Sequence, residues 1–334
     1  MSNDEPIKID MRELVSSGFS PQLAFSFPAG VPPDEQSARI RMLLRVASEI
    51  RHQNSELCFL RLVQVIFTRN VWETVSNLEQ FAEHQLPAAR NGAEQMTVFA
   101  VDLGPVDVIV IREEWLNFLV ANEVGRGRGL WQYTSVLATI SYYTLVKAKF
   151  AQDAWIEAVP ASGPRAFNFA SGVMASYWQG YFTWTPALQT VAAFDLLVDT
   201  LPEEVRQMEV AFDGYAKDGD IHALESNLHK SVTFLCKSMA IAAGYCDAAQ
   251  RPLSHLAPDL WVSIQKADFE ELWSTLELAV REVFASRQDW MSAIEFIPIA
   301  IVEGIFLAKF GIHYGREGGR VVPVFIAPVR SITH

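Results

Sequence analysis

The stretch EFIPIAIVEGIFLAKFGIHYG, residues 295–315, is a long apolar run that decides the class of the protein. A transmembrane helix needs about 20 predominantly apolar residues, because each residue rises about 1.5 Å through a hydrocarbon core about 30 Å thick. Glu303 and Lys309 interrupt this stretch, and a charge at the centre of a bilayer costs at least about 2.5 kcal/mol. We therefore expect a buried helix, apolar nearly all round and surrounded by neighbouring elements.

The bulk composition is that of a globular chain. Its 334 residues are 50% hydrophobic, 11% aromatic and 20% charged, and a chain of this length buries enough surface to fold without disulfide bonds. The cysteines Cys58, Cys236 and Cys246 match no metal-binding spacing, which favours buried thiols in a reducing compartment. The acidic start MSNDEPIKID is unlike a secretory signal, so we expect a cytoplasmic protein.

Acidic residues dominate the charge of the chain. There are 39 Asp and Glu residues against 27 Lys and Arg, a formal net charge of -12. This charge repels phosphate backbones, so we expect no nucleic-acid binding. A basic protein partner would suit such a surface, and the alternative is that the charge only keeps the protein soluble.

The N-terminal third predicts two segments. Residues 1–33 are rich in Pro, Gly and Ser, which is typical of an irregular leader. Residues 34–125 predict a helical unit, including a helix over 56–67, with a β-hairpin at 96–111 around Leu103-Gly104-Pro105. The glycines of VGRGRG, residues 124–129, follow a helix rather than a strand, so we interpret them as a flexible link and not as a dinucleotide loop.

Residues 130–334 predict a domain of helical hairpins. Thr185-Pro186 and the group Thr200, Pro202 and Glu203 resemble helix starts. The fold class is therefore mainly α: stacked antiparallel helical hairpins, with a small β-hairpin insertion and a short C-terminal extended segment that could pair with the hairpin strands. We expect helices at residues 130–150, 165–182, 185–200, 220–249, 267–287 and 297–313.

The segment IHALESNLH holds the strongest candidate for a metal site. His222, Glu225 and His229 stand at i, i+3 and i+7 of an expected helix and could converge on one ion. The leucines of the same helix lie toward another side, and no second motif supplies further ligands. We favour a solvated helix flank, keep an interaction surface and a weak metal site as alternatives, and expect no cofactor.

No catalytic motif stands out. The chain has no G-x-S-x-G elbow, and its paired carboxylates lie at expected helix beginnings, where the helix dipole favours acids. We therefore expect a protein that is not an enzyme. The alternative is an enzyme or ligand-binding protein with a pocket lined by aromatic residues, for which core packing is the more frequent explanation; these residues are Tyr177, Trp178, Tyr181, Phe182 and Trp184.

Three stretches carry a resemblance to a known family. They are FNFASGVMASYWQGYFTW, KADFEELWSTLELAVREVFASRQDW and FIPIAIVEGIFLAKFGIHYGREGGRVVPVFI, and their order and pattern resemble the helical bacterial immunity proteins of the immunity protein 49 family. Pro298 to Gly311 corresponds to the family's apolar run, and Glu317 to Pro323 to its tail. The match covers the C-terminal half to two thirds, and residues 1–125 have no counterpart in it. The resemblance implies a protein that protects the producing cell by binding a cognate toxin, without catalysing a reaction.

The segment EEVRQMEVAFDGYAKDGD, residues 203–220, is the candidate surface for such a partner. It holds six acidic residues against two basic ones, and complementary charge would speed encounter with a basic toxin. An ordinary solvated helix and turn is the alternative. The expected partner-binding residues are Glu203, Glu204, Asp213, Asp218 and Asp220, with the aromatic helix around Trp178 as a second candidate.

Overall fold

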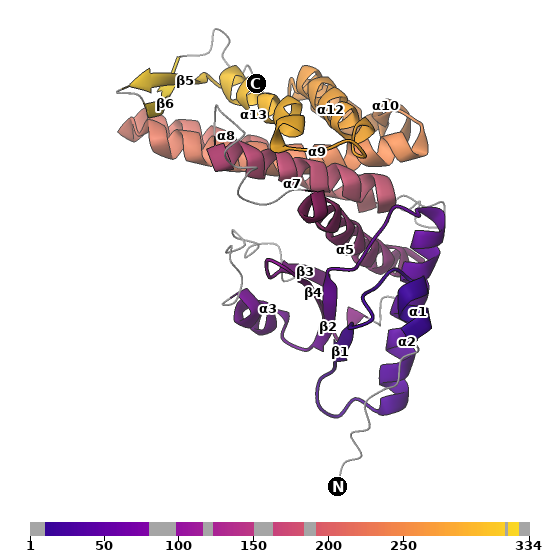
Figure 1. Ribbon diagram of the computed structural model, residues 1–334. Coiled ribbons are helices and arrows are strands. Elements are labelled where there is room, and N and C mark those ends of the chain that lie inside the picture. The colour runs from indigo at the N-terminus through magenta and orange to yellow at the C-terminus, as the bar shows by residue number, and fades with distance from the viewer. Residues whose placement is uncertain are drawn as a thin grey trace. The chain divides into compact units, whose positions relative to one another are not determined.

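The computed structural model describes residues 11–79, 98–115, 123–149, 163–183, 192–317 and 320–326. As predicted, the described chain is mainly α (Figure 1). Contacts divide it into unit 1, residues 1–148 and 182–190, and unit 2, residues 149–181 and 191–334. This division differs from the boundary expected at 125–130, since helix α5 (Glu123–Lys149) runs through the VGRGRG segment that we interpreted as a flexible link.

Unit 1 contains a four-stranded mixed sheet of strand order β1-β2-β4-β3. The strands β1 (Ala24–Ser26), β2 (Leu62–Thr68) and β4 (Asp107–Arg112) are parallel. Strand β3 (Val98–Asp102) pairs antiparallel with β4 and forms the predicted hairpin. Gly104 in its turn has a φ of 87°, which suits glycine because it lacks a Cβ.

Two predictions for unit 1 are wrong. Residues 56–67, expected as helix, contain most of β2, whose β-branched residues suit a strand that pairs on both edges. The leader expected to be irregular contributes helix α1 (Met11–Ser16) and strand β1. Short apolar runs are ambiguous in sequence because a buried strand and a buried helix both lack clear periodicity.

Helices pack against this sheet and against one another. Helix α3 (Val71–Glu79) buries Val71 and Val75 against residues of β3 and β4. Helix α2 (Pro33–Gln53) is joined to α5 where the Tyr133 hydroxyl donates to the Leu43 carbonyl at 3.3 Å. The Arg61 guanidinium, between β2 and the hairpin, donates to the buried Asp107 carboxylate at 2.9 Å.

Unit 2 is built on long helices. Helices α8 (Ala192–Asp218) and α9 (Ile221–Ala249) form an antiparallel hairpin, in which the Ser238 hydroxyl donates to Thr200 Oγ1 at 3.3 Å. Helix α7 (Gly163–Thr183) lies along another side of α9. The remaining elements are α10 (Leu253–Leu256), α11 (Pro258–Lys266), α12 (Glu270–Ala285), the 3₁₀ helix η2 (Ala293–Phe296), α13 (Ile297–Lys309), β5 (Ile312–Glu317) and β6 (Arg320–Phe325).

Two further predictions are corrected in unit 2. Pro202 lies inside α8, so the capping box expected from Thr200 and Glu203 does not start a helix. An interior proline costs about 3 kcal/mol, and the packing of α8 along α9 offsets this cost. The C-terminal extended segment pairs as β6 with β5 in a separate two-stranded sheet, not with the hairpin of unit 1. Thr185-Pro186 lies outside the described residues.

Helices α7 and α9 touch backbone to backbone through two glycines. A Cβ at Gly180 would stand 2.0 Å from the Ile241 carbonyl oxygen, and one at Gly244 would stand 2.3 Å from the Tyr177 carbonyl oxygen. Any other residue at either position therefore forces the helices apart, because backbone atoms cannot move as a flexible side chain can.

Replacing Gly244 with alanine should destabilise the protein by about 3 kcal/mol or more, at the upper end of overpacking effects. Chemical denaturation followed by circular dichroism measures this change. Gly214 in α8 is the matched control, because a Cβ there meets nothing within 4 Å, and Gly214→Ala should be neutral or stabilising by up to about 1 kcal/mol. Equal stability of the two variants would contradict the close contact.

Helix α13 is not surrounded on all sides as we expected from the sequence. Val302 and Phe306 are fully buried, whereas Ile301 is 55% exposed and Ile305 is 44% exposed. The helix also ends at Lys309, four residues before the predicted end, and Gly311 follows with a φ of 81°. One side of α13 is core and the other is open to solvent.

The two sides of α13 should respond differently to a charge. Val302→Asp should unfold the protein, because an unpaired buried carboxylate costs several kcal/mol. Ile301→Asp, one residue away, should change the free energy of unfolding by no more than about 0.5 kcal/mol because the site is exposed. Thermal melts of the two variants test this, and unfolding by Ile301→Asp would contradict the orientation of the helix.

Candidate functional site

The acidic segment predicted as a partner surface lies at the outer side and the turn of the α8–α9 hairpin. Glu203, Asp213, Asp218 and Asp220 are exposed, and Glu204 is half-buried toward α9. Burial is the main reason that the pKa of Glu204 is raised. Glu204 is therefore the least accessible of the five predicted contact residues.

Four of these carboxylates already have partners within the hairpin, and that of Glu204 is Ser231 of α9. Glu203 accepts hydrogen bonds from Arg206 at 2.6 Å and from Gln207 at 2.6 Å, which lower its pKa to about 2. Asp218 accepts from the Asp220 amide at 2.9 Å. Asp220 is the N-cap of α9 and accepts from two amides of its first turn. These side chains stabilise the hairpin, whatever else they contact.

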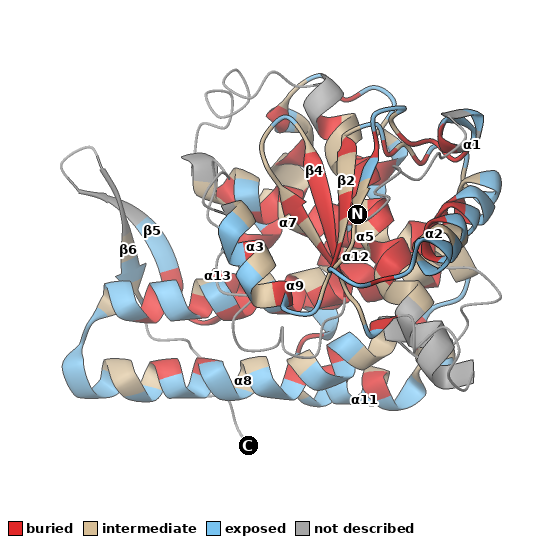
Figure 2. Ribbon diagram, turned by 90° about the horizontal axis from the view of Figure 1, so that it is seen from below, coloured by how far each residue is buried: buried red, intermediate tan, exposed pale blue. Residues whose placement is uncertain are grey.

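The outer face of α8 carries three carboxylates that are both exposed and uncommitted. Asp199, Glu209 and Asp213 are exposed, and their side chains make no hydrogen bond or ion pair with any residue that the structure describes. Figure 2 shows this helix with exposed residues along much of its length. The whole of α8 has seven acidic residues against Arg206 and Lys217, so the face is negative over several turns.

The aromatic segment around Trp178 belongs to the core. Trp178 is 1% exposed and Tyr177 is 2% exposed, so a partner cannot reach Trp178 in this structure. The Tyr177 hydroxyl donates to Asp247 at 2.7 Å, and Arg281 donates to the same carboxylate at 2.8 Å. Phe182 is also buried, Tyr181 is half-buried, and Trp184 lies outside the described residues.

The predicted trio His222, Glu225 and His229 is divided by the fold. His222 is exposed, but Glu225 is buried at 7% exposure, so the expectation that all three lie on a solvated flank is wrong. Glu225 forms an ion pair with Arg165 of α7 and accepts from the Tyr314 hydroxyl of β5 at 2.8 Å. No cluster of three potential metal ligands occurs in the part of the chain that the structure describes.

His229 points instead to a second buried acid. Its Nδ1 atom lies against the carboxylate of Glu303, whose side chain is 9% exposed. The two contacts of Glu225 and the contact of His229 join α9 to α7, β5 and α13 through two buried carboxylates, although Tyr314 itself is 47% exposed. Sequence reasoning missed Arg165, Glu303 and Tyr314, and the only signal was an acid, Glu303, within an otherwise apolar helix.

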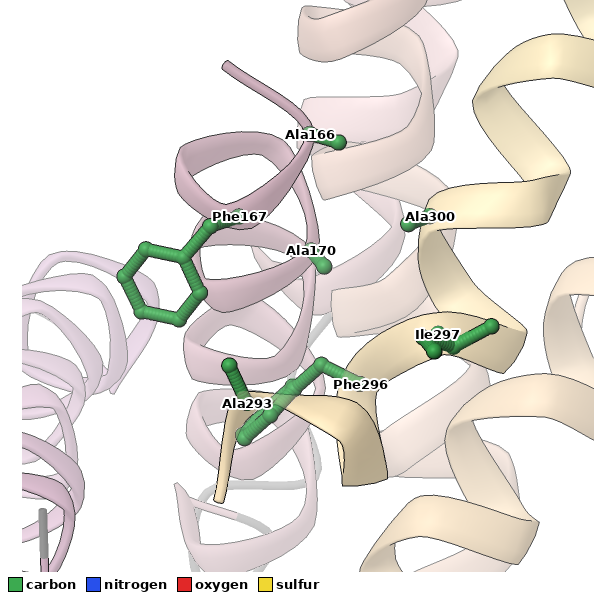
Figure 3. A pocket seen from close by; sticks show the side chains of 7 residues that line it. All are labelled: Ala166, Phe167, Ala170, Ala293, Phe296, Ile297 and Ala300. Atoms are coloured by element: carbon green, nitrogen blue, oxygen red, sulfur yellow. The ribbon is translucent and has the colours of Figure 1, made fainter. Parts of the chain in front are cut away.

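A small apolar recess lies between α7 and the start of α13 (Figure 3). Its free interior is about 10 Å³, which is room for about one water molecule. No polar side chain lines it, and it is too small to hold a substrate. Its walls are Ala166, Phe167, Ala170, Ala293, Phe296, Ile297 and Ala300.

No family model, no curated protein and no solved structure matches this chain. Among the described residues, every helix is too short or too polar to span a bilayer. The apolar run at residues 295–315 contains α13, and this helix packs on one side only.

The pair of His229 and Glu303 should behave non-additively in a double-mutant cycle. His229→Leu alone leaves Glu303 buried without its partner and should cost about 3 kcal/mol. The double variant His229→Leu with Glu303→Met removes both polar groups and should be more stable than that single variant, because apolar replacement of a buried pair is often nearly neutral. Urea denaturation of the unmodified protein, the two single variants and the double variant gives the four free energies of the cycle, and simple additivity would show that the pair is not coupled.

Proposed function

We propose that this protein is an immunity protein that neutralises a cognate bacterial toxin by stoichiometric binding in the cytoplasm of the producing cell. The observation that carries the proposal is the outer face of α8, where Asp199, Glu209 and Asp213 are exposed and uncommitted. The resemblance of the C-terminal sequence to helical immunity proteins points in the same direction.

The position of α8 makes its charges suitable for recognition. The helix has 27 residues and packs along α9, so its carboxylates are held on a fixed scaffold. A preformed helix loses little backbone freedom on binding, which reduces the entropic cost of association. A basic surface on the toxin would be attracted over distances of about 10 Å at 0.1 M salt.

Such a surface should act mainly on the rate of association. Charges at the rim of an interface steer the encounter and select partners, while the apolar centre holds the complex together. Exposed apolar residues are present on the same helix, with Val210 at 53% and Val198 at 49% exposure. They supply area that a partner could bury.

The triple variant Asp199→Lys, Glu209→Lys and Asp213→Lys tests the proposal. With the toxin encoded beside this protein, it should associate about tenfold more slowly or worse at low salt, and the defect should shrink as salt rises. Stopped-flow or surface-immobilised binding gives the rates, and survival of toxin-expressing cells gives the protection.

The matched control reverses three exposed acids elsewhere in unit 2, namely Glu271, Glu282 and Asp289. It changes the net charge by the same amount. If the toxin binds at α8, this control should therefore associate faster than the α8 triple variant. Equal rates for the two triple variants would exclude α8 as the contact surface. Failure of the unmodified protein to bind the neighbouring gene product would overturn the proposed function itself.

A further inference from the structure

The side of α13 that faces solvent is apolar from Ile297 to Ala308, and the exposed Lys309 follows at its end. We call six of its residues the α13 open face, and all six are exposed or half-buried, whereas Val302 and Phe306 on the opposite side are fully buried. They stand at positions i, i+3, i+4, i+7, i+8 and i+11, a pattern that keeps them on one side of the helix. The α13 open face comprises Ile297, Ala300, Ile301, Gly304, Ile305 and Ala308.

Large and small residues alternate across this face. A Cβ at Gly304 would meet nothing within 4 Å, so a protruding side chain from outside can approach the backbone there. Ala300 borders the apolar recess shared with Ala166 and Ala170 of α7 (Figure 3). The face therefore has two positions with small residues, Gly304 and Ala300, beside the protruding side chains of Ile301 and Ile305.

Two copies of the α13 open face are complementary to each other when they lie antiparallel. When the face is placed antiparallel to a copy of itself, Ile301 stands opposite Gly304 of the second copy, and Ile305 stands opposite Ala300. Ile297 stands opposite Ala308 in the same register. Each large side chain thus meets a small residue, which is the arrangement by which helices pack closely.

The charges near the ends of α13 fit the same arrangement. Glu295 precedes the helix and Lys309 is its last residue, so an antiparallel pair brings Glu295 of each copy toward Lys309 of the other. Lys309 pairs with Asp268 at 2.8 Å, but the Asp268 side chain is 92% exposed. That exposed pair leaves the Lys309 ammonium accessible to a second carboxylate. A parallel pair would instead place like charges together at each end.

We propose that the α13 open face is an interface between two copies of this chain, packed antiparallel about a twofold axis. Among soluble homo-oligomers, twofold dimers with a self-complementary interface are the commonest form. Met291 and Ile294, 81% and 52% exposed just before α13, lengthen the apolar strip. One helix face is small beside the 1,200 Å² or more that a stable interface buries. The dimer is therefore weak and forms only at high protein concentration. This inference is independent of the α8 surface and of the proposed function.

Sedimentation analysis of the full chain, from about 1 µM to about 300 µM, tests the proposal. The unmodified protein should pass from monomer to dimer over this range. Gly304→Leu should weaken the dimer at least tenfold, because it fills the position that receives Ile301. The free space at Gly304 and the higher helix propensity of leucine should leave the monomer folded, as circular dichroism can show. The control Leu278→Asp, at a 67% exposed position of α12, should dimerise as the unmodified protein does.

A charge exchange tests the antiparallel orientation. Glu295→Lys should weaken the dimer, and adding Lys309→Glu should restore it. A chain that stays monomeric at about 300 µM would overturn the proposal, and so would a dimer that Gly304→Leu does not affect. Sedimentation of a monomeric chain with vesicles of phosphatidylcholine and phosphatidylglycerol would assign the face to lipid and would also overturn it.

Discussion

The backbone contact between Gly180 and Gly244 is the constraint on which the rest of unit 2 depends. With a Cβ at Gly180 only 2.0 Å from a backbone oxygen of α9, the two helices can approach as they do only if neither residue has a side chain. The contact fixes α7 beside α9 and so fixes which residues further along the two helices meet. Arg165 of α7 reaches Glu225 of α9 in this way, and Tyr177 reaches Asp247.

Helix α9 is the central element because its neighbours bury it on several sides. The Glu225 and His229 side chains turn inward and bind groups from α7, α13 and β5. Buried charges of this kind contribute little net stability, but they penalise any packing in which they lose their partners. They therefore help to set how α13 and the C-terminal hairpin lie on α9. The outward sides of α8 and α13 remain for contacts with other molecules.

The sequence predicted the helical class and the β3–β4 hairpin because both rest on local patterns. Periodic apolar residues indicate long helices, and Gly104 between two β-branched runs indicates a tight turn. The sequence failed where tertiary contacts decide. Pro202 looks like a helix start, yet α8 continues through it because α9 supports it. Strand β2 looks like a helix until its two neighbours in the sheet are known.

For the candidate surfaces too, local patterns are visible in the sequence and tertiary contacts are not. The acidic character of residues 203–220 is visible in the sequence, but which carboxylates are uncommitted depends on hydrogen bonds such as those of Glu203 and Asp220. The ion pair of Glu225 with Arg165 joins residues 60 positions apart, and no local sequence pattern predicts it. The open side of α13 could not be predicted either, because its residues are as apolar as the buried ones.

Hydrogen–deuterium exchange of the full chain tests most directly whether the contact of α7 with α9 organises unit 2. Amides of α7 around Gly180 and of α9 around Gly244 should be the slowest to exchange in unit 2, because they should open only when the unit unfolds. Amides on α8 and α13 should exchange faster through local opening. If the amides around Gly180 exchanged as fast as those on the outer side of α8, the contact would not be the constraint that holds the unit together.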